Sequence, residues 1–214
     1  MTRAAEFEML EVLCHPVIDV KMAKLRDKDT PSQDFRRILF ELAGLMSASV
    51  FRHIKTVSIE IETPLEPITA VALPVHVPCI VSILRAGNGM ADALSALLPE
   101  AAIGHMGLQR DPDTHNPEYY YEKLPPEIKA RQVIMTDPML ATGGSAIMTA
   151  DRLKSRGVTD IVFCCLVAAP EGVHAFTTAH PDIPIITAAL DRELNENCYI
   201  LPGLGDAGDR IYNT

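Results

Sequence analysis

The hydrophobic positions in the first third of the chain follow two different periods. After Pro31 and Ser32, apolar residues recur every three or four positions, which predicts a long amphipathic helix built on Phe35, Ile38, Leu39, Leu42, Leu45 and Met46. Residues 57–62 instead alternate between apolar and polar side chains, the pattern of a half-buried strand. The proline-rich stretch 64–78 then predicts a loop or an edge pairing.

From residue 79 onward, the apolar residues form short continuous runs separated by helical patterns. We expect strands at 79–84, 101–108, 133–136, 160–167 and 183–190, and helices at 90–98, 145–156 and 171–179. Continuously apolar strands are buried on both faces, so the fold class is α/β, with a mainly parallel central sheet flanked by helices. Ligands bind at the carboxyl ends of the strands in such sheets, and the polar residues directly after each strand are therefore the candidates for function.

The composition fits one globular domain over residues 1–214, with 48% hydrophobic and 22% charged residues. We divide it into an N-terminal helical segment of about 1–52, a core of about 79–190 and a C-terminal segment of about 191–214. The formal net charge is 19 − 28 = −9, which disfavours binding to a nucleic-acid backbone. The sequence has no run of about 18 apolar residues, so we expect no membrane span.

The cysteines have no spacing typical of a metal or redox site. There are five, at positions 14, 79, 164, 165 and 198, and no two of them form a C-x-x-C pair. An odd, scattered set without a signal peptide predicts buried reduced thiols in a cytoplasmic protein.

The strongest chemical signal is the stretch 133–153, a short apolar strand followed by Asp137, a Thr-Gly-Gly-Ser turn and a helix. A glycine turn that enters a helix presents free backbone N–H groups at the positive end of the helix dipole, where a phosphate can bind. The alternative is an ordinary turn in which Ser145 caps the helix. Folding alone does not require Asp137 beside that turn, and no Lys follows the glycines as in a nucleoside-triphosphate P-loop.

Three further segments carry polar residues where ligands would bind. Arg85 follows a strand and precedes two glycines, a weak motif by itself. Residues 109–125 form a long polar and aromatic stretch, either a solvated hairpin or a lid over a site. Residues 199–212 combine four glycines and two aspartates with flanking apolar residues, which predicts a loop packed on the core whose backbone can approach a flat ligand.

The stretch from Asp137 to Ser145 resembles the loop that binds 5-phospho-α-D-ribose 1-diphosphate (PRPP) in type I phosphoribosyltransferases, in the form carried by the uracil phosphoribosyltransferase family. The resemblance implies that Asp137 accepts hydrogen bonds from the ribose hydroxyls and that the loop holds the 5-phosphate. The implied PRPP-binding residues of this loop are Asp137, Pro138, Met139, Leu140, Ala141, Thr142, Gly143, Gly144 and Ser145. Many members of the wider fold have two adjacent acids here, whereas Thr136 precedes Asp137 in this chain, as in the uracil enzymes.

The other segments match the same family in the same order. The turn after Leu84 resembles the one whose arginine meets pyrophosphate, which implies that role for Arg85. Residues 109–125 resemble a flexible loop over the active site, in which Arg110 contacts pyrophosphate. Together with Asp137, these two arginines are the implied catalytic residues, and both also bind PRPP. The C-terminal segment resembles the family's uracil-binding segment, so that Ile200, Gly205, Asp206 and Ala207 contact uracil and Asp206 also faces PRPP.

The resemblance implies the type I phosphoribosyltransferase fold and the transfer of a 5-phosphoribosyl group from PRPP to uracil, giving uridine monophosphate (UMP) and diphosphate in pyrimidine salvage. It also implies Mg²⁺ carried mainly by PRPP, a homodimer or higher homo-oligomer, and guanosine triphosphate (GTP) as an effector. Two alternatives stay open: a regulatory protein of the same fold that senses PRPP or nucleotides, and transfer to another nucleobase. No residue stands out as a general base for uracil N1.

Overall fold

The structure is a computed structural model that describes residues 7–110 and 117–214. Its centre is a sheet with the strand order β1-β10-β9-β7-β4-β5-β6, and β8 pairs with β9 beside this path. The strands are β1 (Leu10–Val12), β4 (Cys79–Leu84), β5 (Ala102–Arg110), β6 (Pro117–Lys123), β7 (Val133–Thr136), β8 (Met139–Leu140), β9 (Ile161–Ala168) and β10 (Ile185–Leu190). Every pairing in this sheet is parallel except that of β5 with β6. The predicted mainly parallel sheet is confirmed.

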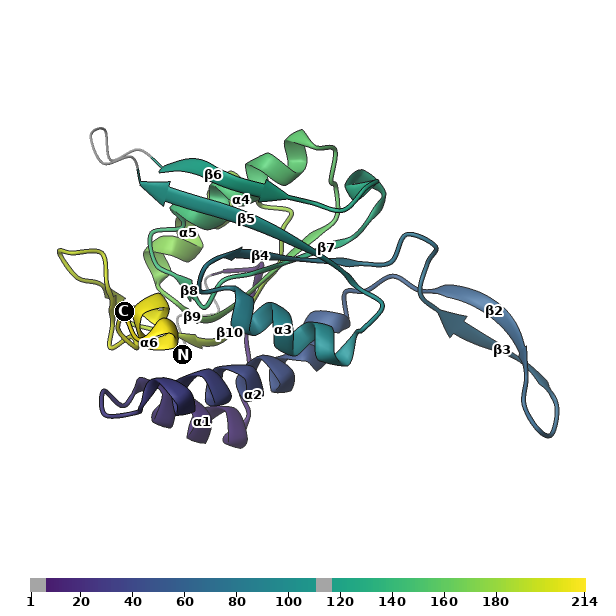
Figure 1. The fold of residues 1–214 in the computed structure, drawn as a ribbon, viewed down its shortest axis with the longest axis horizontal. Helices are drawn as coiled ribbons and strands as arrows, with labels where there is room; N and C mark the ends of the chain where they lie inside the picture. Colours follow the sequence, from purple (N-terminus) through teal and green to yellow (C-terminus); the bar gives the residue numbers. More distant parts are fainter. Residues whose placement is uncertain (1–6, 111–116) are drawn as a thin grey trace.

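Helices cover both faces of the sheet (Figure 1). On one face lie α1 (Pro16–Arg26), α2 (Ser32–Phe51) and α3 (Asn88–Leu97), and on the other lie α4 (Gly144–Ser155) and α5 (Pro170–Ala179). Successive residues of a strand point to opposite faces, so Ile80 packs with the first group of helices and Val81 with the second. The continuous apolar runs in the sequence are therefore strands buried on both sides.

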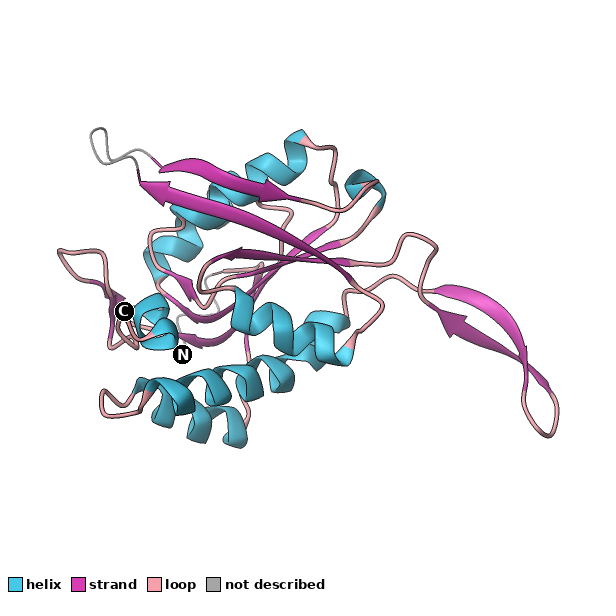
Figure 2. Ribbon diagram, in the orientation of Figure 1, coloured by secondary structure: helices cyan, strands magenta, loops and turns pink. Residues whose placement is uncertain are grey.

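The β2–β3 hairpin projects away from the sheet and its helices (Figure 2). Its strands β2 (Val57–Glu62) and β3 (Pro67–Ala72) pair only with each other. The predicted strand at 57–62 is confirmed, but the expectation that it is half-buried is wrong, because all six residues of β2 are exposed. An alternating pattern shows that one face of a strand is apolar, but it does not show whether another part of the same chain packs on that face.

Residues 117–123 form the antiparallel edge strand β6, which pairs with β5 as in the hairpin alternative for the stretch 109–125. The strands β1 and β8 were not among the expected elements. Two short helices, α1 and α6 (Ala207–Tyr212), had no clear apolar period. The remaining short elements are η2 (Ile128–Ala130), β11 (Glu193–Leu194) and β12 (Ile200–Leu201). The expectation of buried thiols holds for three cysteines and is wrong for Cys14 and Cys198, which are exposed.

The layer between the sheet and α5 gives a test of this packing. Phe176 is fully buried, and its ring lies 5.3 Å from the ring of Phe163 and 5.5 Å from that of His180, measured between centroids. We predict that Phe176→Ala lowers the free energy of unfolding by about 3–5 kcal/mol, because it removes apolar contacts and leaves a cavity. Urea denaturation measures this loss. The matched control is Phe40→Ala on the 44% exposed Phe40 of α2, and an equal loss in both variants would contradict the assigned core.

Candidate active site

The glycine turn joins β7 to α4 through Asp137, β8 and residues 141–143. Gly143 precedes the helix with a φ of +86°, a conformation that glycine adopts without strain, and no side chain caps the helix there. Ile147 donates a backbone hydrogen bond of 2.8 Å to Gly143 O, so the N–H groups before it are free of intrahelical partners. Ser145 thus lies inside the first turn of α4 rather than capping it. The turn has the geometry of an anion site.

Backbone packing fixes the shape of this turn. A Cβ atom on Gly172, in the first turn of α5, would lie 2.2 Å from Ala141 O and 2.7 Å from Leu140 O. The N–H of Ala169 donates a 2.9 Å hydrogen bond to Leu140 O. Only glycine at position 172 lets α5 approach so closely, and the segment 168–172 therefore supports the turn.

Arg85 lies at the end of β4, the strand next to β7 in the sheet. A Cβ atom on Gly87 would lie 2.3 Å from Thr136 O, so the backbone after Arg85 packs directly on the end of β7. The Thr136 hydroxyl donates a 3.2 Å hydrogen bond to Gly87 O and is buried. Residue 136 is thus engaged in joining the two turns, and this explains why a threonine precedes Asp137.

The role of Asn88 had no explanation from the sequence. In the structure, its side-chain oxygen accepts a 2.7 Å hydrogen bond from the hydroxyl of Ser82, which is buried in β4. A buried hydroxyl without a partner would be costly. Asn88 therefore stabilises the strand that leads to Arg85.

Asp137 is a carboxylate without a cationic partner. Its Oδ1 accepts one long hydrogen bond, 3.5 Å, from the N–H of Met139, and among the described residues no Lys, Arg or His pairs with it. Its pKa is raised to about 7: burial is the main cause, the negative charge of Asp206 also raises it, and the Met139 hydrogen bond lowers it. Asp206 is therefore close enough to influence Asp137, so the fold places the glycine turn near the C-terminal segment.

A buried ion pair holds the C-terminal segment against α1. Asp191, only 8% exposed, forms two hydrogen bonds of 2.6 and 2.7 Å with the guanidinium of Arg26. The same carboxylate accepts from Gly203 N at 2.8 Å, and Arg26 donates to Gly203 O at 2.7 Å. The local sequence gives no signal for this pair, because Arg26 and Asp191 are 165 positions apart.

The residues predicted to contact the base lie on both sides of Gly203, which the Arg26–Asp191 ion pair holds. Ile200 and Ala207 are buried, and Gly205 has a φ of +78°. Asp206 caps α6 by accepting a 2.9 Å hydrogen bond from Asp209 N. Arg210 donates to the carbonyls of Leu25 and Leu204 at 2.7 and 2.8 Å. The glycine-rich end of the chain is therefore packed on the core, as predicted.

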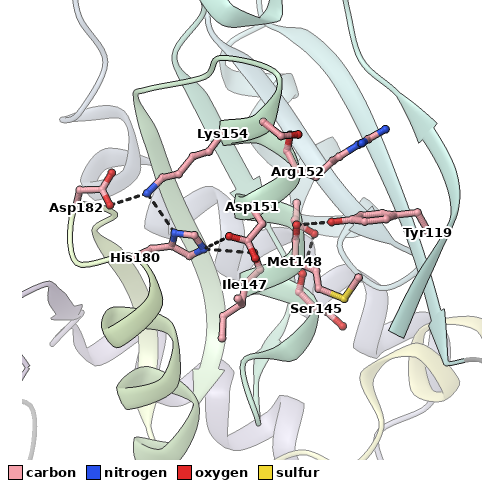
Figure 3. Close-up of polar contacts among 11 residues, drawn as sticks. Tyr119, Ser145, Ile147, Met148, Asp151, Arg152, Lys154, His180 and Asp182 are labelled. Carbon is pink, nitrogen blue, oxygen red and sulfur yellow. Dashed lines mark hydrogen bonds and ion pairs between the residues drawn. The ribbon is translucent and has the colours of Figure 1, made fainter. Parts of the chain in front are cut away.

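Side chains from two directions hold helix α4 (Figure 3). The buried His180 contacts Lys154 Nζ through Nδ1 at 3.2 Å and the carbonyl of Ile147 through Nε2 at 3.3 Å. On the other side, Tyr119 of β6 donates a hydrogen bond to the carbonyl of Met148. Nothing in the local sequence around His180 indicated this position. The Ile147 carbonyl that it contacts lies in the first turn of α4, directly after the glycine turn.

One predicted part of the site is not described. Arg110 is the last residue of β5, and its side chain and residues 111–116, with His115, lie outside the described part of the chain.

The donor set suits a metal ion that arrives with its own phosphate ligands. In the parts of the chain that the structure describes, no three His, Cys, Asp or Glu side chains are grouped to hold a metal. Asp137 and Asp206 supply two carboxylates near each other, and Mg²⁺ commonly binds through one or two carboxylates together with substrate phosphates.

No helix within residues 7–110 and 117–214 is long and apolar enough to cross a membrane.

The raised pKa of Asp137 predicts a dependence of stability on pH. The folded protein holds the Asp137 proton up to about pH 7, whereas the unfolded chain releases it near pH 4, so the wild type loses stability as pH rises between these values. We expect Asp137→Asn to be more stable than the wild type by about 2–4 kcal/mol at pH 8 and nearly equal at pH 4. Denaturant unfolding at the two pH values measures the difference, and a variant less stable at pH 8 would contradict the account.

Comparison with known proteins identifies the family. The sequence profile of uracil phosphoribosyltransferase matches residues 12–214. The chain is 53% identical to a uracil phosphoribosyltransferase of Pediococcus pentosaceus over 204 residues, which covers 95% of this chain and 98% of the relative. It is 49% identical to one of Dictyoglomus thermophilum, covering 96% of this chain and all of the relative.

Solved structures share the fold of this chain. The AQ2163 protein of Aquifex aeolicus superposes with a TM-score of 0.87 at 31% identity, covering 95% of this chain and 98% of that one. A hypoxanthine-guanine phosphoribosyltransferase of Bacillus anthracis shares the fold alone, with a TM-score of 0.50 and 10% identity over 74% of this chain and 80% of that one. The sheet flanked by helices is that of the type I phosphoribosyltransferases. The chain belongs to the uracil phosphoribosyltransferase family.

Proposed function

We propose that this protein is a pentosyltransferase that moves the 5-phosphoribosyl group of PRPP to N1 of uracil, giving UMP and diphosphate in pyrimidine salvage. The observation that carries the proposal is that the glycine turn, Arg85 and the C-terminal segment lie together at the carboxyl ends of β4 and β7. The backbone after Arg85 packs on Thr136 O, and Tyr212 of the C-terminal segment donates a 2.8 Å hydrogen bond to Arg85 O. The proposal also draws on relatives named uracil phosphoribosyltransferase that align along nearly the whole chain.

PRPP would bind across the ends of β4 and β7. The backbone N–H groups of residues 141–145 and the hydroxyls of Thr142 and Ser145 would hold the 5-phosphate, since they lie at the start of α4. Asp137 would accept hydrogen bonds from the ribose hydroxyls, which offer this half-buried carboxylate the donors that the protein does not. Arg85, on the adjacent strand, would bind the pyrophosphate.

Uracil would bind against the C-terminal segment. A pyrimidine edge alternates donors and acceptors, and backbone N–H and C=O groups of Ile200 and residues 205–207 can match such an edge without a dedicated side chain. Gly205 has no Cβ, so its backbone is open to close approach. Asp206 would lie between the base and PRPP, since its charge reaches Asp137.

The reaction replaces the bond from ribose C1 to pyrophosphate with a bond to uracil N1, while the N1 proton is lost. C1 becomes oxocarbenium-like as the leaving group departs, so catalysis depends on alignment of the reactants and on neutralisation of the leaving charge. Arg85 and Arg110 would supply positive charge to pyrophosphate, and closure of the loop that carries Arg110 would exclude water. Asp137 and Asp206 are the carboxylates of the site that could face a Mg²⁺ ion bound with PRPP, which would supply further positive charge at the pyrophosphate.

We also propose that the protein forms a homodimer or a higher homo-oligomer in the cytoplasm. The support in the structure is the β2–β3 hairpin, whose apolar residues on β2 are exposed, because a two-stranded hairpin is marginally stable unless something packs on it. Regulation by GTP rests on the family resemblance.

A base-competition assay tests the proposed function. We expect the protein, supplied with PRPP and Mg²⁺, to release pyrophosphate with uracil and not with cytosine, hypoxanthine or adenine. Gly205→Val should raise KM for uracil at least about tenfold, because a branched side chain is strained at a φ of +78° and fills the space beside the base. The control is Gly44→Ala in α2, where a Cβ meets no atom within 4 Å. Equal use of several bases, or uracil kinetics unchanged in Gly205→Val, would contradict the proposal.

A further inference from the structure

Tyr212 lies on α6, which follows the proposed base-binding segment, and contacts the arginine proposed to bind pyrophosphate. Its hydroxyl donates a 2.8 Å hydrogen bond to the main-chain carbonyl of Arg85. The guanidinium of Arg85 lies over the Tyr212 ring, with its central carbon 5.1 Å from the ring centroid. One side chain therefore contacts both the backbone and the charged group of Arg85.

The protein holds the backbone of α6 firmly beside the start of α2 (Figure 1). The carbonyl of Ile211, the residue before Tyr212, accepts hydrogen bonds from Ser32 and Arg36 of α2 at 3.0 and 2.6 Å. The Ile211 side chain is buried, and Arg210 is bonded to the carbonyl of Leu25. Tyr212 thus projects from a fixed platform toward the end of β4.

Arg85 has little else to fix its side chain. The residue is exposed, and within the described residues its guanidinium makes no ion pair or hydrogen bond. A free arginine loses considerable rotamer entropy when it binds an anion. Contact with an aromatic face restricts the guanidinium before the ligand arrives, and such preorganisation strengthens binding without a new contact to the ligand.

We propose that Tyr212 is a positioning residue that holds Arg85 in place for pyrophosphate and so joins the base-binding segment to the leaving-group side of the site. This inference rests on the proposed function in taking Arg85 as a pyrophosphate ligand. Tyr212 itself touches Arg85 and not the reacting atoms. Arg85 and Tyr212 are 127 residues apart in the sequence, and Tyr212 reaches Arg85 from the helix that follows the proposed base-binding residues.

Two variants separate the contributions of Tyr212. Tyr212→Phe removes the hydrogen bond and keeps the ring, whereas Tyr212→Leu removes both. The control for the loss of an aromatic ring is Phe51→Leu at the last residue of α2, a half-buried position outside every segment assigned to the site. Calorimetry with magnesium pyrophosphate measures binding without turnover, and steady-state kinetics gives KM for PRPP and for uracil.

We expect pyrophosphate affinity to fall about threefold in Tyr212→Phe and about tenfold in Tyr212→Leu, with KM for PRPP rising in parallel. KM for uracil and the melting temperature should change little, since Ser32, Arg36 and Arg210 still hold α6. In an Arg85→Ala background, Tyr212→Leu should have no further effect on pyrophosphate affinity, because the group that it positions is gone.

Three results would overturn the inference: unchanged pyrophosphate affinity in Tyr212→Leu, an effect confined to KM for uracil, or a full additional loss in the Arg85→Ala background. Wild-type protein that binds no pyrophosphate would also overturn it. Failure of the proposed function looks different, since pyrophosphate would bind and respond to Tyr212 while uracil gave no turnover.

Discussion

The site depends on one unbalanced charge, the carboxylate of Asp137. The backbone around it is held by contacts that leave no room for adjustment: Gly87 against Thr136 on one side and Gly172 against Ala141 on the other. The protein thereby keeps a carboxyl group partly out of water with only a long backbone hydrogen bond, and it places Asp206 near enough to raise the pKa further. Such an arrangement costs stability in the free protein, and hydroxyl donors and a cation arriving with a substrate would offset that cost.

The contacts that hold the C-terminal segment also affect Asp137, through the charge of Asp206. Asp206 belongs to a segment that the Arg26–Asp191 pair and Arg210 fasten to α1. Moving this segment would change both the surface proposed to bind uracil and the electrostatic environment of Asp137. The contacts of Arg26, Asp191 and Arg210 therefore support the proposed site, although none of these residues needs to touch a substrate.

Local patterns in the sequence predicted the strands β4, β5, β7, β9 and β10, most of the helices and the glycine turn, because burial on two faces and helix starts leave marks in neighbouring residues. The short strands β1 and β8 have too few residues to show such a pattern. Local patterns could not predict the exposure of β2, since alternation looks the same whether or not the chain covers a strand. They left β6 undecided between a hairpin strand and a lid, because its consecutive tyrosines and acidic residues lack a period of two. Contacts such as Arg26 with Asp191 and Tyr212 with Arg85 join residues more than a hundred positions apart, and neither partner has a local signature of its role.

The ionisation of Asp137 is the most direct measure of whether the site is built on an uncompensated carboxylate. Carbon-13 NMR of protein labelled at the aspartate carboxyl carbons, assigned with Asp137→Asn, can follow this group through a pH titration. The account predicts a pKa near 7 in the free protein and a marked fall when PRPP and Mg²⁺ are added, because bound hydroxyl donors and positive charge favour the carboxylate. An ordinary pKa near 4 in the free protein, unchanged by PRPP and Mg²⁺, would contradict it.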